Sequence, residues 1–310
     1  MSTATQPLMV PRTGVLALLQ DYAELFKLRV TSLIVMTAWC GYYLGSLKNG
    51  TSSLQWGLLH ALLGIGLVSG GTAAFNEIIE RREDALMRRT QHRPLPANHM
   101  GLVHAVVVAL VATLGGVVYL YYLANPGTAL LALATAVAYL GLYTPLKKVS
   151  PLCTFVGAFP GAMPGVLGWT AARGRLEVEA LILFAIVFFW QFPHFHSIAW
   201  LYREDYENAE IRMLPVVDSD GKSTIRAILF YLVALIPVSL APTLLHMAGW
   251  LYFAGALALG FAFLWTGVRL AKLDMPPGKP RSKQRARQVL IASVFYLPLL
   301  FALMMLNAIA

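Results

Sequence analysis

The sequence predicts an all-α polytopic membrane protein, a bundle of about nine transmembrane helices, and three observations support this prediction. First, 58% of the 310 residues are hydrophobic and only 13% are charged, whereas an average soluble domain carries about 25% charged residues. Second, apolar stretches of about 20 residues, long enough to cross a hydrocarbon core of roughly 30 Å, recur along the chain. Third, basic residues are concentrated in alternate connecting segments. This composition excludes both a disordered chain and a water-soluble globule.

The predicted spans follow one another with short polar or charged segments between them. Glycine and proline interrupt the fourth and the fifth span. Because the helices of one bundle share one body, we expect a single domain over residues 1–310. The first fourteen residues have neither the basic start nor the apolar block of a signal peptide, and residues 1–25 are expected to form a flexible cytoplasmic segment. The expected spans are 30–47, 55–76, 102–123, 127–145, 152–170, 180–200, 226–246, 249–268 and 288–309.

The connecting segments carry a charge asymmetry that predicts the orientation in the membrane. Of the 24 Lys and Arg residues, 21 fall in or beside the segments on one side of the predicted bundle. The other side receives Lys48, Arg173 and Arg175. Because Lys and Arg are retained on the cytoplasmic side, we expect the N-terminus in the cytoplasm and the C-terminus outside. The expected location is the inner membrane of a bacterium.

The cysteines and the last basic segment of the sequence bear on which further sites are expected. The two cysteines, Cys40 and Cys153, lie in apolar stretches and predict neither a disulfide framework nor a thiolate metal site. The last basic segment, residues 272–287, is typical of contact with anionic membrane lipids. No nucleic-acid partner is expected.

The end of the second span carries a stripe of oxygen-bearing side chains. Asn76, Glu80 and Asp84 stand at i, i+4 and i+8, and this spacing places them on one face of an α-helix over about 12 Å. Mg²⁺ is usually held by a few carboxylates together with substrate phosphates. Five arginines follow between residues 81 and 93, and guanidinium groups are natural partners of phosphate oxygens. The alternative is a solvated helix end in which the carboxylates form ion pairs with neighbouring arginines.

The end of the sixth span carries a second polar segment. Asp205 is its clearest candidate ligand, and Ala209 occupies the position four residues later, where a second acidic residue would share its helix face. Glu204 with Asn208 offers an alternative pair at the same spacing. The two charged segments together predict a site at the cytoplasmic ends of the helices.

These segments resemble the motifs of the UbiA-type intramembrane prenyltransferases. Asn-x-x-x-(Asp/Glu)-x-x-x-Asp followed by Met-x-Arg-Thr-x-x-Arg-Pro is similar to the first aspartate-rich motif of that family, in which the middle position is more commonly Asp than Glu. Residues 190–195, 202–209 and 213–217 resemble the branch that prenylates haem B, and so do residues 143–148 and 161–169. Leu28 replaces a proline that is usual at the entry to the first span. The first motif matches at Asn76, Glu80, Asp84, Met87, Arg89, Thr90, Arg93 and Pro94.

The resemblance implies transfer of the farnesyl group of farnesyl diphosphate to a vinyl group of haem B, which gives haem O. It implies Mg²⁺ as cofactor and a downstream haem A synthase as a partner. The residues implied to hold Mg²⁺ and act in catalysis are Asn76, Glu80, Asp84 and Asp205. Those implied to bind diphosphate are Lys27, Arg89, Arg93, Lys147 and Arg203. Contact with the prenyl chain or the porphyrin is assigned to Tyr139, Tyr143, Trp190, His194 and Tyr206.

The two neighbouring histidines of the sixth span are expected to have different roles. His194 and His196 are two residues apart, and a regular helix points such side chains about 160° away from each other. Joint ligation of one haem iron is therefore not expected. We assign His194, which stands in the matching Pro-His pattern, to porphyrin contact or proton transfer.

Two other functions remain as alternatives. The same scaffold could act on a quinone-type aromatic acceptor, although Ala209 in place of a second aspartate argues against this acceptor. A secondary transporter also uses polar residues within a helical bundle. Transporter ligands bind near mid-helix, whereas the polar groups of this sequence lie at helix ends.

Overall fold

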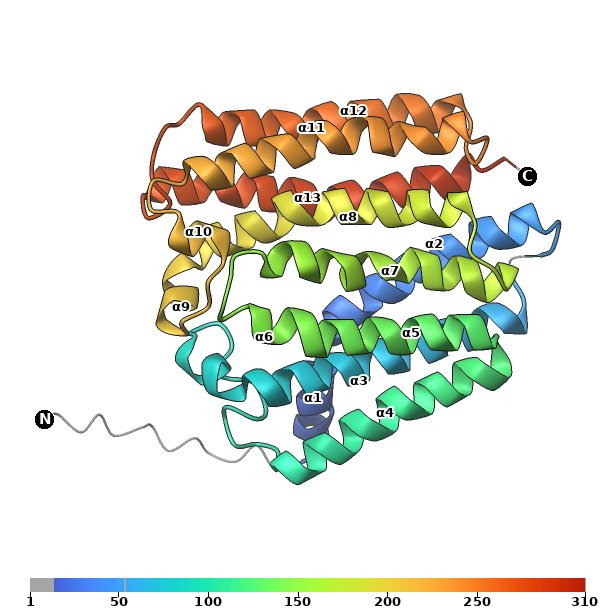
Figure 1. The fold of residues 1–310 in the computed structure, drawn as a ribbon, viewed down its shortest axis with the longest axis horizontal. Helices are drawn as coiled ribbons and strands as arrows, with labels where there is room; N and C mark the ends of the chain where they lie inside the picture. Colours follow the sequence, from blue (N-terminus) through green and yellow to red (C-terminus); the bar gives the residue numbers. More distant parts are fainter. Residues whose placement is uncertain (1–13, 53, 310) are drawn as a thin grey trace, which may run out of the picture.

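The computed structural model describes residues 14–52 and 54–309, and Figure 1 shows a bundle of long helices that run alongside one another. Eight helices or helical segments of this described part are long and apolar enough to cross a membrane. The long helices are α2 (Leu28–Lys48), α3 (Trp56–Leu86), α4 (Leu102–Leu123), α5 (Pro126–Ala138), α7 (Cys153–Arg173), α8 (Val178–Leu201), α11 (Lys222–Leu244), α12 (Trp250–Ala271) and α13 (Pro280–Leu306). Short elements are α1 (Val15–Leu25), the π-helix η1 (Tyr139–Tyr143), α6 (Thr144–Leu146), α9 (Arg203–Asn208) and α10 (Leu214–Val217).

The expected all-helical architecture is confirmed, and each expected span coincides with a helical segment. The fourth span is continuous from Pro126 to Leu146 because η1 and α6 extend α5. The fifth span, α7, has the same 21-residue length as α2 but is not among the eight apolar spans. Glycines and prolines, including Pro160 and Pro164 within the helix, dilute its apolar side chains.

The N-terminal segment differs from the sequence-based expectation. Residues 1–13 lie outside the described residues, but the rest of the segment expected to be flexible is the helix α1. Leu25 is fully buried against α3 and α4, and the Tyr22 hydroxyl lies 2.7 Å from Nε2 of His104. Asp21 contacts His99 as well. These contacts join residues about 80 positions apart in the chain, and sequence periodicity carries no signal for them.

A close helix crossing joins α2 and α7, and α2 passes behind α7 in Figure 1. A Cβ atom at Gly41 would overlap the carbonyl oxygen of Gly165, and one at Gly168 would overlap that of Ala38. Small residues allow two backbones to approach in this way, and in membranes such approach drives helix association. The crossing fixes the middle of the bundle.

The two ends of the bundle have different character. The connections after α3, α6 and α8 gather with α9 and α10 at one end (left in Figure 1). At the opposite end, Lys48, Arg173 and Arg175 all lie within 4 Å of the Glu177 carboxylate. The three basic residues predicted for the minor side therefore surround one acidic residue. The hydrogen bond from Arg173 lowers the pKa of Glu177 to about 2.

Candidate active site

The predicted stripe of oxygen-bearing side chains lies at the end of α3. This helix has 31 residues and is about 46 Å long, so its last turns extend beyond a hydrocarbon core of roughly 30 Å. Asn76, Glu80 and Asp84 are all buried. The alternative of a solvated helix end is therefore wrong for these three residues, although Asp84 does form an ion pair with an arginine of the following segment, Arg93. Buried polar groups of this kind require partners.

Each member of the stripe has a cationic partner, and the three cations come from different connections of the chain. Nζ of Lys27, at the junction of α1 and α2, donates to Oδ1 of Asn76 over 2.7 Å. Nζ of Lys147, just after α6, lies 2.6 Å from Oε1 of Glu80. The guanidinium of Arg93, in the α3–α4 connection, lies 2.6 Å from Oδ2 of Asp84. We call these six residues the charged cluster: Lys27, Asn76, Glu80, Asp84, Arg93 and Lys147.

Lys27 reaches the cluster through an unusual backbone conformation. It stands between α1 and α2 with φ 46°, in the left-handed region that non-glycine residues rarely adopt. The packing of α1 against α3 and α4 holds this conformation, which turns the side chain toward Asn76. Burial, and to a lesser degree the nearby Arg93 guanidinium, lowers the pKa of the Lys27 ammonium to about 8.

The π-helix η1 places two tyrosines beside the cluster. The rings of Tyr139 and Tyr143 are 5.0 Å apart, and Nζ of Lys147 lies 4.6 Å from the centroid of the Tyr143 ring. Isolated π-helical turns frequently occur at functional sites. The next residue, Thr144, accepts a hydrogen bond from Nδ2 of Asn76 over 3.2 Å. Sequence reasoning did not select Thr144, because its motif pointed to the tyrosines and lysines around it.

Glu77 is a second residue that sequence reasoning missed. Its side chain is 0% exposed, and neither carboxylate oxygen forms a hydrogen bond or ion pair with another side chain of the described residues. Lys27, Arg93 and Asp84 lie within electrostatic reach of it. A sequence signal existed, since an acidic residue directly beside Asn76 sits in an otherwise apolar stretch.

The second charged segment approaches the first through aromatic contacts. The Arg89 guanidinium lies 5.3 Å from the centroid of the Tyr202 ring and donates a hydrogen bond of 3.3 Å to the hydroxyl of Tyr206. Arg203 instead donates to the carbonyl oxygen of Val216 over 3.3 Å. Asp205 is half-buried on α9, and no hydrogen bond or ion pair joins its carboxylate to the cluster within the described residues. The structure therefore brings Arg89 and Tyr206 into contact with each other. Asp205 and Arg203 form no hydrogen bond or ion pair with the charged cluster among the described residues.

Trp190 and His194 lie together on α8 at its contact with α13. Their rings stack with centroids 4.7 Å apart. Nε1 of Trp190 donates to the carbonyl oxygen of Ser293, and Nδ1 of His194 lies 2.8 Å from the Ser293 hydroxyl. His196 points elsewhere: its ring is buried beside Phe192, and its Nδ1 has no hydrogen-bond partner among the described residues. The expected divergence of the two histidines is thus observed.

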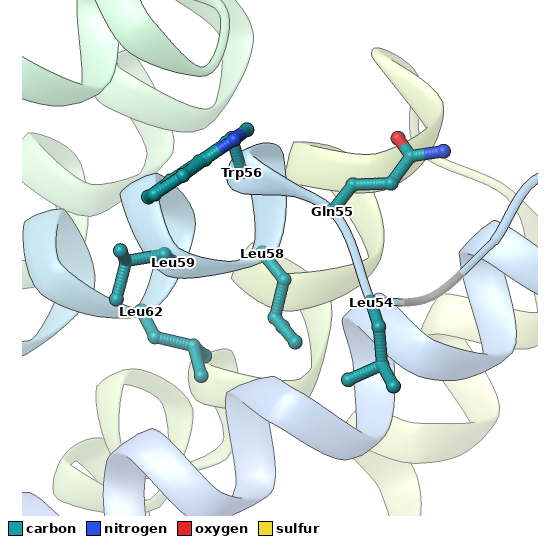
Figure 2. Close-up of a pocket in the computed structure, with 6 residues that line it drawn as sticks. All are labelled: Leu54, Gln55, Trp56, Leu58, Leu59 and Leu62. Atoms are coloured by element: carbon teal, nitrogen blue, oxygen red, sulfur yellow. The ribbon is translucent and has the colours of Figure 1, made fainter.

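Two pockets open at opposite ends of the bundle. One, of about 400 Å³, lies where α3 begins, and Figure 2 shows its uncharged lining of Leu54, Gln55, Trp56, Leu58, Leu59 and Leu62. Its last lining residue, Leu62, stands 14 positions before Asn76 on α3, so the pocket lies several helical turns away from the cluster. The other, of about 350 Å³, is lined by Lys148, the residue after Lys147 of the cluster, and by residues between 207 and 217.

The oxygen donors fit a divalent cation that shares its coordination shell with a substrate. In residues 14–52 and 54–309, no three Asp, Glu, His or Cys side chains converge on a common metal-binding position. Glu80 and Asp84 with the amide oxygen of Asn76 supply hard oxygen ligands, and Mg²⁺ typically combines one or two carboxylates with phosphate oxygens and water. The three cations of the cluster are suited to the same phosphate oxygens.

Known proteins are similar to this chain in sequence and in fold. The sequence matches the UbiA prenyltransferase family over residues 34–294. It is 61% identical, over 99% of either chain, to the protoheme IX farnesyltransferase of Koribacter versatilis (strain Ellin345). The structure resembles a solved digeranylgeranylglyceryl phosphate synthase with a TM-score of 0.74, at 19% identity over 93% of this chain and 98% of that chain. A UbiA homolog from Archaeoglobus fulgidus bound to GPP and Mg²⁺ gives 0.64, at 14% identity over 92% and 99%.

Proposed function

The chain belongs to the UbiA prenyltransferase family, and we propose that it transfers the farnesyl group of farnesyl diphosphate to a vinyl group of haem B, forming haem O. The observation that carries the proposal is the 61% identity to a protoheme IX farnesyltransferase over nearly the whole of both chains. The buried charged cluster supplies the groups that loss of diphosphate requires. A quinone-type acceptor is the alternative, and it is tested below.

Asn76, Glu80 and Asp84 would hold Mg²⁺ at the end of α3, with Asp205 joining them if α9 moves inward. Bound there, Mg²⁺ neutralises negative charge that develops on the leaving diphosphate. Lys27, Arg93 and Lys147 each contact one oxygen of the stripe. When the negative diphosphate arrives, these three cations exchange their contacts with α3 for phosphate oxygens, which leaves the stripe free for the metal.

Aromatic side chains border the place where the allylic carbon would ionise. Tyr139 and Tyr143 lie on η1 beside Lys147. In this proposal their ring faces stabilise positive charge on the farnesyl group, and the half-buried rings limit its contact with water. Arg89 with Tyr206 closes the site from α9. Arg203, which holds α10 through Val216, would reach diphosphate only after that contact is released.

The acceptor side of the site is assigned to α8. Trp190 and His194 present a stacked aromatic pair that suits contact with a porphyrin plane. In this proposal the haem is a substrate. Its vinyl carbon forms the new bond to the farnesyl carbon, and water supplies the hydroxyl group of the product.

The proposed location is the bacterial inner membrane, with the charged cluster at the cytoplasmic side. The excess of Lys and Arg in the connections at that end supports this orientation. Membrane lipid would then deliver the farnesyl chain, and a haem A synthase would consume the product.

The test is a reconstitution with purified protein in lipid. Haem B, farnesyl diphosphate and Mg²⁺ are added with or without EDTA, and mass spectrometry measures a haem heavier by one farnesyl group and one hydroxyl group. A Mg²⁺-dependent product from the wild type, lost in Asp84→Asn while the variant still inserts in the membrane, is the expected result. Binding of farnesyl diphosphate without any haem product would refute the acceptor and favour the quinone-type alternative. Absence of binding by folded protein would refute the proposal as a whole and favour a transporter.

A further inference from the structure

A chain of hydrogen bonds links the charged cluster to the backbone of η1. Nζ of Lys27 donates to Oδ1 of Asn76 over 2.7 Å. Nδ2 of Asn76 donates to the Thr144 hydroxyl over 3.2 Å, and that hydroxyl donates to the carbonyl oxygen of Tyr139 over 3.0 Å. Thr144 is 3% exposed, so its hydroxyl has little access to water.

The π-helical turn explains how Thr144 comes to face Asn76. The backbone N–H of Thr144 also bonds to the carbonyl oxygen of Tyr139, five residues earlier. The wider turn therefore ties Thr144 to Tyr139 twice, through the backbone and through the side chain. The hydroxyl hydrogen is committed to this carbonyl, and the hydroxyl presents lone pairs to α3.

An acceptor at this position decides which end of the Asn76 amide faces it. The amide of asparagine has one donor end and one acceptor end. Because the hydroxyl of Thr144 accepts, the NH₂ group turns toward it and the oxygen turns toward Lys27 and the rest of the charged cluster. A metal ion binds the amide oxygen and not the NH₂ group.

We propose that Thr144 is a positioning residue, which holds the amide of Asn76 with its oxygen directed at Mg²⁺ and diphosphate. This inference rests on the proposed function. Lys27 favours the same amide orientation in the substrate-free protein, but its ammonium is expected to move to the diphosphate. Thr144 is buried and tied to η1, so it keeps the amide oriented when Lys27 has left.

The first part of the experiment compares Thr144→Val with Thr144→Ser. Valine keeps the shape of threonine and removes the acceptor, whereas serine retains the hydroxyl. The readout is the Mg²⁺ concentration that half-saturates binding of farnesyl thiolodiphosphate, an unreactive analogue, measured by calorimetry in detergent. Loss of an outer partner of a metal ligand typically weakens metal affinity by about 10- to 100-fold, and we expect about 10-fold for valine. Serine should restore the wild-type value, and the melting temperature reports folding of both variants.

The second part repeats the comparison in an Asn76→Asp background. A carboxylate has two equivalent oxygens, so no wrong orientation exists for Thr144 to prevent. In this background Thr144→Val should raise the half-saturating Mg²⁺ concentration by less than about twofold. The difference between the effects in the two backgrounds is the coupling between Thr144 and Asn76, which a double-mutant cycle measures.

The outcomes separate this inference from the proposed function. An equal effect of Thr144→Val in both backgrounds, or no effect in the wild-type background, overturns the positioning role while the proposed function stands. A wild type that binds the analogue without any need for Mg²⁺ overturns both.

Discussion

The ion pair between Arg93 and Asp84 gives an asymmetric prediction for stability without metal. The Asp84 side chain is 1% exposed and the Arg93 side chain is 21% exposed. Arg93→Met leaves a buried carboxylate without its partner. Asp84→Asn leaves a cation that still reaches water. The arginine variant should therefore be the less stable of the two.

The expected magnitudes follow from the burial of each orphaned charge. Removing one partner of a buried ion pair costs about 3–5 kcal/mol when the remaining charge is buried. For Asp84→Asn we expect about 1 kcal/mol, since the remaining charge is partly hydrated. In a chain of this length each kcal/mol lowers the melting temperature by about 2 °C, so the expected decreases are about 6–10 °C and about 2 °C.

The assay is thermal unfolding in detergent, first with EDTA and then with Mg²⁺ alone, because Arg93 itself is proposed to bind the diphosphate. A divalent cation restores positive charge beside Asp84, so Mg²⁺ should raise the melting temperature of Arg93→Met more than that of the wild type. Arg88→Met is the control, because Arg88 is exposed in the same segment. The prediction fails if Asp84→Asn is as unstable as Arg93→Met, or if Mg²⁺ gives Arg93→Met no additional stabilisation.

Two further predictions concern helix packing and pH. Gly168→Ala forces a methyl group onto the carbonyl oxygen of Ala38 and should cost about 1–3 kcal/mol by thermal unfolding, whereas Gly115→Ala meets no atom within 4 Å and should cost nothing. The pKa of Glu177 is lowered from 4.5 to about 2, chiefly by Arg173, so the carboxylate stabilises the fold above pH 4.5 and this contribution is lost as the pH falls toward 2. Glu177→Gln should thus lower the free energy of unfolding at pH 6 by about 1 kcal/mol, after allowance for solvent screening. The difference in unfolding free energy between the variant and the wild type should disappear near pH 2. A difference that persists at pH 2 would contradict the stabilising role of the Glu177 carboxylate.

Local patterns in the sequence were sufficient for the helices and for the stripe on α3. A run of apolar residues of the right length predicts a span wherever it occurs, because the bilayer imposes the same requirement on every helix. The spacing of Asn76, Glu80 and Asp84 predicts a common face, because residues four apart in an α-helix are neighbours. Both relations depend on residues that are close in the chain.

The partners of that stripe could not be predicted in the same way. Lys27 and Lys147 are 49 and 67 residues from the atoms that they contact, and many basic residues stand in equivalent loop positions. The helix α1 was expected to be flexible because its sequence is short and lies before the first span. Its order arises from packing against α3 and α4, which also sets the left-handed turn at Lys27.

Composition and spacing along single helices were sufficient to predict the helical membrane architecture, the family motif and the chemical character of the candidate site. The tertiary structure decided which cation faces each oxygen, the place of Thr144 behind Asn76 and the burial of Glu77. It also decided that Trp190 and His194 face α13. Contacts between helices depend on how the whole bundle packs, so the periodicity of any single helix does not predict them.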